Sequence, residues 1–336
     1  MFWQALRCDG AGRTWCPPDL GWAPCQCWER GGGLADVDPG RQPGNGRLDW
    51  PFPSASVPRP CRRCSSRDLC TLMYPGGRLA YDITGPGHAA LVLCVAGMGD
   101  TRAAFRFVAP KLVEAGYRVV CMDQRGHGQS SPSWSGYGSA ATGEDMLTLI
   151  RHLGGPATIM GRSNAAAAAI WAAAQEPAQV SGLALVGPFL RDARPSPILR
   201  LAQRIVTASP LLWTRFYYPS LYKAAKPADF DQYLRVMRSL LHEPGRMAAL
   251  RGVATEQERC RARIPELGCP VRIVMGTKDP DFPDAVAEAG QGEALIGQST
   301  EVSLELIDGA GHYPHAELPE VTAAAILPFL ADVVSA

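Results

Sequence analysis

Ser163 is the residue of this sequence best placed to act as a nucleophile. It follows an apolar run at 157–160 and precedes an alanine-rich segment, which predicts a strand, a tight turn and a helix. A serine hydroxyl must be lifted clear of a sheet to reach a base and a carbonyl carbon, and the pattern G-x-S-x-G achieves this with small flanking residues. Here the pattern reads Gly161-x-Ser163-x-Ala165. The alternative is that Ser163 only caps the helix.

Two further side chains with suitable chemistry follow predicted strands. Asp279 comes after the apolar run 271–275, and His312 comes after the run 302–307. Loops at the carboxyl ends of parallel strands lie along one edge of an open α/β sheet, where ligands bind. We therefore expect Ser163, Asp279 and His312 to meet, which is the set of groups that nucleophilic acyl transfer requires.

Strand and helix patterns alternate from about residue 76 onward, which predicts an α/β fold with a mostly parallel central sheet flanked by helices. The strand patterns cover residues 78–84, 89–95, 117–122, 157–161, 182–186, 271–275 and 302–307. The helix patterns cover residues 103–114, 141–153, 164–174 and 320–334. We expect the core of this fold to consist of residues 73–187 and 265–336.

The alternation stops over residues 188–264, where prolines interrupt helical patterns. An inserted helical cap fits this region, and its aromatic side chains predict an apolar cleft for a small substrate. Trp213, Phe216 and Tyr217 are the candidate substrate-binding residues. For each of them the alternative is that it packs the cap onto the body of the fold.

Residues 1–72 differ in composition from the rest of the chain. They hold five of the eight tryptophans and no lysine, and they show no sustained strand or helix period. We expect an extended, mostly disordered N-terminal segment. Because a fold pattern begins directly after Met73, a further hypothesis is that Met73 is the true start of the native protein.

The placement of the cysteines argues against a disulfide framework and against a metal site. Seven of the eleven cysteines precede Met73. Cys61, Cys64 and Cys70 have part of the spacing of a zinc site, but residues 1–72 contain no histidine to complete it. We therefore predict no metal and no organic cofactor.

The charge balance limits the classes of partner. The 336-residue chain carries 33 basic and 32 acidic residues, a net charge of +1. A near-neutral surface gives no reason to expect nucleic acid or an anionic membrane as a partner. The sequence has neither an apolar run long enough to span a membrane nor the pattern of a secretory signal at its start. We expect a cytoplasmic protein that acts on a small molecule, and no sequence feature specifies a protein partner.

Four motifs, in this order, resemble the α/β-hydrolase superfamily over about residues 74–336. They are Asp123-x-Arg125-Gly126-His127-Gly128-x-Ser130, Gly161-Arg162-Ser163-Asn164-Ala165, Gly276-x-x-Asp279 and Gly311-His312-x-x-His315-x-Glu317-x-Pro319-Glu320. The order serine, aspartate, histidine along the chain is also the order of this superfamily. The resemblance is to its serine-nucleophile, cap-bearing hydrolases and esterases.

This resemblance implies a role for each residue. Ser163 would be the nucleophile, His312 the general base and later the acid for the leaving group, and Asp279 the carboxylate that orients the imidazole. The backbone N–H groups of Met98 and Asn164 would form the oxyanion hole. The family often carries a histidine two residues before the first of these donors, where this chain has an alanine.

The rival assignments are His315 for the base and Asp281 or Asp192 for the acid. The resemblance places the base on the first histidine of the motif and makes His127 part of a turn that stabilises the fold. Two charged residues near the expected site, Asp100 and Arg162, have no role that the sequence reveals.

The sequence as a whole predicts a carboxylesterase-like serine hydrolase that cleaves an ester, thioester or lactone of a small apolar substrate through an acyl-enzyme intermediate. Dehalogenases and epoxide hydrolases of the superfamily use aspartate at the position of Ser163, so they are set aside. Acyltransferases and hydrolases of carbon–carbon bonds use the same triad and stay open as alternatives. A non-catalytic, ligand-binding protein of the same fold also stays open, and the alanines at positions 96 and 165 favour it slightly.

Overall fold

The computed structural model describes residues 69–74, 76–190, 197–255 and 260–335. Within these residues, eight strands form one sheet in the order β1-β2-β4-β3-β5-β6-β7-β8. The strands are β1 (Leu69–Tyr74), β2 (Gly77–Thr84), β3 (Leu91–Val95), β4 (Arg118–Met122), β5 (Ala157–Arg162), β6 (Val180–Val186), β7 (Val271–Gly276) and β8 (Val302–Ile307). The strands from β3 to β8 run parallel to one another, whereas β2 pairs antiparallel with both β1 and β4. The predicted α/β fold with a mostly parallel sheet is confirmed.

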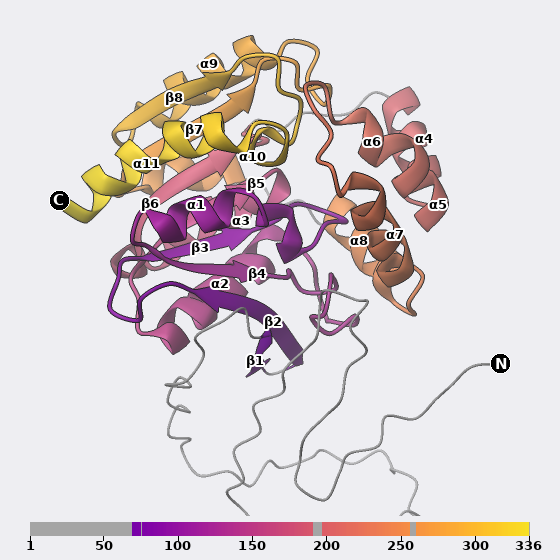
Figure 1. Cartoon of the computed structure of the whole chain (residues 1–336), viewed down its shortest axis with the longest axis horizontal. Coiled ribbons are helices and arrows are strands. Elements are labelled where there is room, and N and C mark those ends of the chain that lie inside the picture. The colour runs from indigo at the N-terminus through magenta and orange to yellow at the C-terminus, as the bar shows by residue number, and fades with distance from the viewer. Residues whose placement is uncertain (1–68, 75, 191–196, 256–259, 336) are drawn as a thin grey trace, which may run out of the picture. The chain divides into compact units, whose positions relative to one another are not determined.

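Helices flank the sheet on both faces (Figure 1). Outside the region between β6 and β7 they are η1 (Arg102–Phe105), α1 (Val108–Glu114), α2 (Ser139–Leu153), α3 (Asn164–Gln175), η2 (Pro177–Gln179), α9 (Ala285–Ile296), α10 (Pro314–Glu317) and α11 (Pro319–Ser335). Side chains of α2 and α3 share one apolar core with the sheet, and side chains of α1 and α11 share a second core with it. No helix of the described residues has both the length and the apolar composition to cross a membrane.

Strand β3 is apolar throughout because both of its faces are covered. In β3, Leu91, Leu93 and Val95 enter the core formed with α2 and α3, while Val92 and Cys94 enter the core formed with α1 and α11. Successive side chains of a strand point to opposite faces, so a strand between two helical layers needs apolar residues at every position. This burial explains why continuous apolar runs marked the strands in the sequence.

The structure differs from the sequence-based prediction at several elements, among them η2 and α10, which were not predicted. The first strand, β1, begins at Leu69, four residues before the expected boundary of the core, and pairs with β2. The expected helix over 103–114 is divided into η1 and α1 at residues 106–107. The helix α9 was not predicted. The N-terminal segment up to residue 68, including Cys61 and Cys64, lies outside the described residues.

Between β6 and β7 the chain forms a helical insertion, grouped at one side of the sheet in Figure 1. Its helices are α4 (Pro197–Val206), α5 (Pro210–Leu212), η3 (Trp213–Tyr217), α6 (Tyr218–Ser220), α7 (Phe230–Leu241), α8 (Arg246–Thr255) and η4 (Cys260–Glu266). The insertion has its own apolar cluster, which also contains Tyr313 and Ala316 from the chain after β8. The helical insertion is thereby packed against the loop that carries His312.

Candidate active site

Ser163 occupies the turn between β5 and α3, with a backbone φ of 55° and ψ of −124°. Among the residues that the structure describes, it is the one non-glycine residue with a positive φ. Such a backbone costs about 1–3 kcal/mol and persists only where its surroundings impose it. The strand and helix are very close here, because a Cβ on Gly161 would lie 2.9 Å from the carbonyl oxygen of Ala165. Ser163 therefore has the strained strand-to-helix turn that exposes a nucleophile in hydrolases.

Asp279 and His312 lie in the loops after β7 and β8, and they are hydrogen bonded. Nδ1 of His312 is 2.6 Å from Oδ2 of Asp279, and both side chains are buried. The backbone N–H of His312 donates to the carbonyl oxygen of Leu221 at 2.9 Å. Burial lowers the pKa of His312, but the negative charges of Asp279 and Asp281 outweigh it and hold the pKa above its ordinary value. Because Nδ1 is engaged, Nε2 is the nitrogen left to exchange a proton.

The end of β6 lies between Ser163 and His312 and contacts both. The backbone N–H of Ser163 donates to the carbonyl oxygen of Val186 at 2.9 Å. A Cβ on the next residue, Gly187, would lie 3.2 Å from the ring of His312. No hydrogen bond joins Oγ of Ser163 to His312 in the part of the chain that the structure describes. Catalytic hydrogen bonds between a nucleophile and its base are often long without substrate and shorten when substrate binds.

The two predicted oxyanion donors flank Ser163. Asn164 is the first residue of α3, and Met98 follows Gly97, on which a Cβ would lie 2.9 Å from the Cβ of Ser163. Among the described residues, the backbone N–H groups of Met98 and Asn164 have no acceptor in the protein. Two unpaired N–H groups beside a nucleophile are what an oxyanion hole requires.

Gln124 connects the two sides of this predicted oxyanion hole. Its side-chain amide donates to the carbonyl oxygen of Ala96, and its Oε1 accepts a hydrogen bond from Nδ2 of Asn164 at 3.4 Å. Ala96 stands where the hydrolase family often carries a histidine. The loop before Met98 is therefore held through its backbone by Gln124, without a side chain at position 96.

The three predicted substrate-binding residues lie in different surroundings. Trp213 is only 2% exposed and packs on Gly99, while Phe216 is 61% exposed. Tyr217 is half-buried, and its hydroxyl donates to both carboxylate oxygens of Asp281 at 3.1 and 3.2 Å. The structure thus brings only Tyr217 into contact with a residue beside His312.

The rival residues for the base and the acid also have distinct positions. His315 is fully buried against Phe105 and Tyr313, and neither ring nitrogen has a partner among the described residues. Burial, with the nearby charge of Arg162, lowers the pKa of His315 far below its ordinary value.

Asp281, a rival for the acid, lies on the other side of His312 from Asp279, with Oδ2 3.6 Å from Nε2. The third rival, at position 192, lies outside the described residues.

A buried polar cluster connects the loops of the site, and no role for its members was apparent from the sequence. Asp100, in the loop after β3, accepts hydrogen bonds from the hydroxyls of Tyr218 and Tyr233 of the helical insertion. Nη2 of Arg162 lies 3.4 Å from Oδ2 of Asp100 and donates to the hydroxyl of Tyr313 at 2.9 Å. The available signal was a charged residue at the end of each of two apolar strand patterns, Asp100 after 89–95 and Arg162 after 157–161. The cluster joins the residues next to Ser163 and His312 to the insertion.

Glu317, in α10, is a second residue whose role the sequence did not reveal. Its buried carboxylate accepts hydrogen bonds from the backbone N–H groups of Gly311 and Tyr313, at 3.0 and 3.1 Å, and these two residues lie on either side of His312 in the sequence. It also accepts the N–H groups of Lys223 and Ala224 at 2.7 Å. The signal was its fixed place in the motif that contains His312. One carboxylate thus fastens the histidine loop to the helical insertion.

The motif from Asp123 to Ser130 stabilises the fold. Arg125 forms a buried bidentate pair with Asp145, with both contacts at 2.7 Å. Ser130 bridges the backbone of β2 and the loop, because its Oγ accepts from Ala80 N–H and donates to the carbonyl oxygen of Asp123. Burial lowers the pKa of His127, whose Nδ1 contacts a backbone carbonyl oxygen in the same turn.

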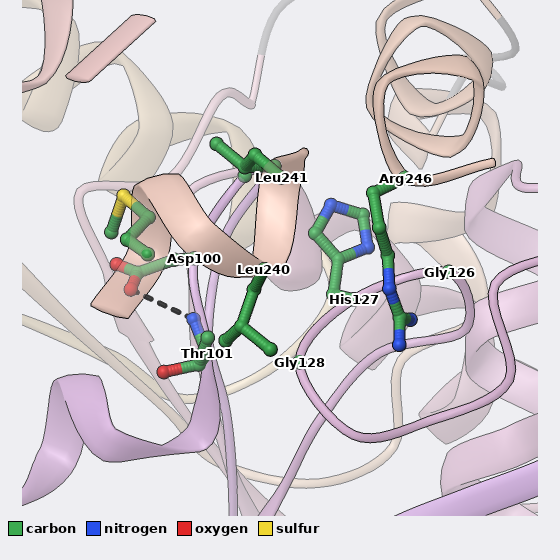
Figure 2. Close-up of a pocket in the computed structure, with 10 residues that line it drawn as sticks. Asp100, Thr101, Gly126, His127, Gly128, Leu240, Leu241 and Arg246 are labelled. Carbon is green, nitrogen blue, oxygen red and sulfur yellow. Dashed lines mark hydrogen bonds between the residues drawn. The ribbon is translucent and has the colours of Figure 1, made fainter. Parts of the chain in front are cut away.

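A small pocket is lined by residues of the loop after β3, of this turn and of the helical insertion. Figure 2 shows Asp100 and Thr101 on one side of it and His127 and Arg246 on the other. Its lining residues are Gly99, Asp100, Thr101, Gly126, His127, Gly128, Met237, Leu240, Leu241 and Arg246. Neither the serine nor the histidine of the candidate site is among them, so this pocket is not the place where a carbonyl group would meet the nucleophile.

The site has one group of side chains that could hold a metal ion. Asp279, Asp281 and His312 offer ligand atoms within 4.8 Å of one another. However, Asp279 and Nδ1 of His312 already bond to each other at 2.6 Å. The remaining donors, Nε2 and the carboxylate of Asp281, are fewer than the three or four protein ligands of a zinc site. The geometry fits a carboxylate–imidazole pair better than it fits a metal centre.

An eight-stranded, mostly parallel sheet with a serine turn after β5 defines the α/β-hydrolase class. The sequence over residues 86–319 matches the family described as serine aminopeptidase, S33. The match covers more than half of the chain, and the protein belongs to this family of α/β-hydrolases.

Individual proteins are similar to most of the chain. A proposed carbamate hydrolase of Variovorax paradoxus is 26% identical over 276 residues, which cover 76% of this chain and 97% of that protein. The 2-(acetamidomethylene)succinate hydrolase of Mesorhizobium japonicum is 24% identical over 275 residues, which cover 76% of this chain and 92% of that protein. A thermophilic esterase from Thermogutta terrifontis, of known structure, superimposes with a TM-score of 0.64 at 25% identity, covering 80% of this chain and 99% of that one. These relatives are hydrolases.

Proposed function

We propose that this protein is a serine hydrolase that cleaves a carboxylic ester, thioester or lactone of a small apolar substrate through an acyl-enzyme intermediate. The observation that carries the proposal is the strained backbone of Ser163, at the same end of the sheet as the bonded pair of His312 and Asp279. A strained turn at a serine and a buried carboxylate–imidazole pair have no shared structural purpose. Together they are the parts of an activated nucleophile.

Each group has one task in the proposed reaction. Nε2 of His312 takes the proton of Ser163 as Oγ attacks the carbonyl carbon and the carbonyl electron pair moves onto oxygen. The N–H groups of Met98 and Asn164 stabilise this oxyanion. The imidazolium then gives its proton to the leaving group as the bond from the carbonyl carbon to that group breaks. A water molecule, deprotonated by His312, next attacks the acyl-enzyme, and the acyl–Oγ bond breaks to release the acid and restore Ser163. Asp279 holds the ring in the required tautomer throughout.

The helical insertion is proposed to act as the cap that selects the substrate. It contacts the histidine loop through the hydrogen bond from the backbone N–H of Lys223 to Glu317. It contacts the loop after β3 through the hydrogen bonds that the hydroxyls of Tyr218 and Tyr233 donate to Asp100. Its apolar cluster also includes the half-buried side chain of Met98. A site closed by apolar and aromatic side chains favours a small apolar substrate. Epoxide opening is not proposed, because the residue at the turn is a serine.

Covalent labelling with an uncharged fluorophosphonate tests this proposal, because the probe reacts only with activated serines. We expect the purified parent protein to be labelled and the variants Ser163→Ala and His312→Ala to remain unlabelled. The control Ser239→Ala changes an exposed serine of α7 and should be labelled like the parent. A folded parent that stays unlabelled would contradict the proposal and favour a non-catalytic, ligand-binding protein.

The type of acyl chemistry needs a second measurement. Hydrolysis predicts that short p-nitrophenyl esters release the phenol and the free acid in equal amounts. An acyltransferase would instead transfer the acyl group to an added alcohol or thiol in preference to water. A carbon–carbon bond hydrolase would be labelled by the probe but would turn over these esters poorly.

A further inference from the structure

The carboxylate of Asp281 faces the nitrogen of His312 that must handle the proton. Oδ2 of Asp281 lies 3.6 Å from Nε2, while Asp279 occupies Nδ1 of the same ring. The backbone N–H of Asp281 donates to Oδ1 of Asp279 at 3.0 Å. The side chain of Asp281 is 14% exposed, more than the other two side chains. The imidazole therefore has a carboxylate at each of its two nitrogens.

The helical insertion fixes the position of this second carboxylate. The hydroxyl of Tyr217 donates to both oxygens of Asp281, and the ring of Tyr217 packs on Trp213 with centroids 4.8 Å apart. Both aromatic residues belong to η3, a five-residue π-helix. Helical segments of this kind are rare and are frequently found at functional sites. Asp281 is thus held at Nε2 from the insertion and is not free to turn into solvent.

More negative than positive side chains surround the ring of His312. The titratable and charged groups that face it from the surrounding elements are Asp279, Asp281, Arg162, Tyr217, Tyr313 and His315. The guanidinium of Arg162 reaches only the backbone carbonyl oxygen of His312, at 3.5 Å, and is itself paired with Asp100. Among the described residues, no lysine or arginine forms an ion pair with Asp281. The protonated imidazole is therefore the cation that Asp281 meets.

We propose that Asp281 is a further catalytic residue, which stabilises the imidazolium that forms when Nε2 of His312 takes the proton of Ser163. This role rests on the proposed hydrolase function. The proton passes from Oγ to Nε2 as the bond from Oγ to the carbonyl carbon forms, and it later leaves Nε2 for the leaving group. Asp281 takes no proton itself and supplies a fixed negative charge. Tyr217 is the positioning residue that keeps this charge at Nε2.

Titration of the His312 ring by NMR tests the contact without any substrate. We expect Asp281→Asn to lower the pKa of His312 by about one unit, since it removes a nearby opposite charge and keeps the side-chain volume. Tyr217→Phe should shift the pKa in the same direction by less, because the carboxylate remains but is no longer held. The control Asp308→Asn removes an exposed carboxylate from the loop after β8 and should leave the titration of His312 unchanged.

The rate of fluorophosphonate labelling at different pH values tests the catalytic consequence. For Asp281→Asn we expect the half-maximal rate at a lower pH than in the parent and a plateau reduced about tenfold. If the variant Asp281→Glu recovers part of the plateau labelling rate, the result would support a role for the negative charge at this position. A labelled parent whose Asp281→Asn variant keeps the parent pKa and plateau would overturn the role of Asp281 and leave the hydrolase function standing. An unlabelled parent would overturn both.

Discussion

Arg162 and Tyr313 are stacked, with the guanidinium carbon 3.9 Å from the centre of the ring. Arg162 directly precedes Ser163, and Tyr313 directly follows His312. The contact between Arg162 and Tyr313 therefore joins the turn that carries Ser163 to the loop that carries His312. Cation–π contacts that are shielded from water are worth about 2 kcal/mol, so this contact is a substantial part of the link.

Removing the positive charge of this contact should destabilise the protein strongly. Arg162→Met leaves the buried carboxylate of Asp100 without its cation, and we expect a loss of about 3–5 kcal/mol in the free energy of unfolding, measured with urea. Arg151→Met, which breaks partly exposed ion pairs with Glu144 and Glu176, should cost less than about 1 kcal/mol. Equal losses in the two variants would contradict the importance of the buried cluster.

Replacing the carboxylate of Glu317 by an amide should loosen the histidine loop. The glutamine of Glu317→Gln has one acceptor oxygen, so its NH2 group must face backbone N–H groups that now have no partner. We expect a loss of about 2–4 kcal/mol in unfolding free energy and slower labelling of Ser163. The control Glu320→Gln alters an exposed carboxylate of α11 and should change neither measurement. If the Glu317→Gln variant is less stable but its Ser163 is labelled at the parent rate, the carboxylate of Glu317 contributes to stability and not to the reactivity of Ser163.

A methyl group on Gly97 should disturb the nucleophile without unfolding the protein. The added Cβ would lie 2.6 Å from Nη2 of Arg162 and 2.9 Å from the Cβ of Ser163. We expect Gly97→Ala to be labelled about 10²-fold more slowly than the parent, since the methyl group displaces both Ser163 and the loop with Met98, the proposed oxyanion donor. Gly87→Ala is the matched control, because a Cβ there meets nothing within 4 Å.

The stability of the protein should fall with acidification, and His315 should account for part of the fall. Burial keeps the folded-state pKa of His315 far below the ordinary value of 6.5. Below about pH 6.5 the unfolded chain binds a proton that the folded chain does not, so stability is lost as the pH falls. Each such histidine contributes at most about 1.4 kcal/mol per pH unit. Unfolding free energies between pH 7 and pH 5 should depend less on pH in His315→Met, and His88→Met is the exposed control.

Two carboxylates around one imidazole should also discriminate between substrates by charge. Phenyl acetate and 4-acetoxybenzoate differ in a carboxylate on the leaving group, which departs toward Nε2. We expect kcat/KM to be about tenfold lower for the anionic ester at low ionic strength, and the difference to narrow in Asp281→Asn. A ratio that is the same in parent and variant would show that Asp281 does not face the leaving group.

The positions of the three candidate residues in the fold were predictable because they depend on local sequence. Ser163, Asp279 and His312 each follow an apolar strand, and the parallel sheet brings the ends of such strands to one edge. Helix α9 was missed because its glycines, Gly290 and Gly292, interrupt the helical pattern, and β1 was missed because it follows a segment with no pattern.

Contacts between distant segments were not predictable. The bond between Tyr217 and Asp281 spans 64 positions, and the position of Tyr217 depends on the π-helical turn of η3. The aromatic residues of the insertion suggested a substrate surface, but the sequence did not show that Trp213 would be buried and Phe216 exposed. Which face of a short helix is covered is decided by its partner, and no local pattern contains that information.

The alanines of α3 have a consequence for anyone who wishes to engineer this protein. The residues from Ala165 to Ala169 are all buried in the core that α3 shares with the sheet and with α2. Strand and helix are so close at the turn that a Cβ at position 161 would lie 2.9 Å from the carbonyl oxygen of Ala165. Larger side chains in this helix would push Ser163 away from His312, its proposed base, so randomising these alanines should yield mainly inactive variants. Libraries aimed at new substrates should leave α3 unchanged and sample the exposed and half-buried positions of the helical insertion.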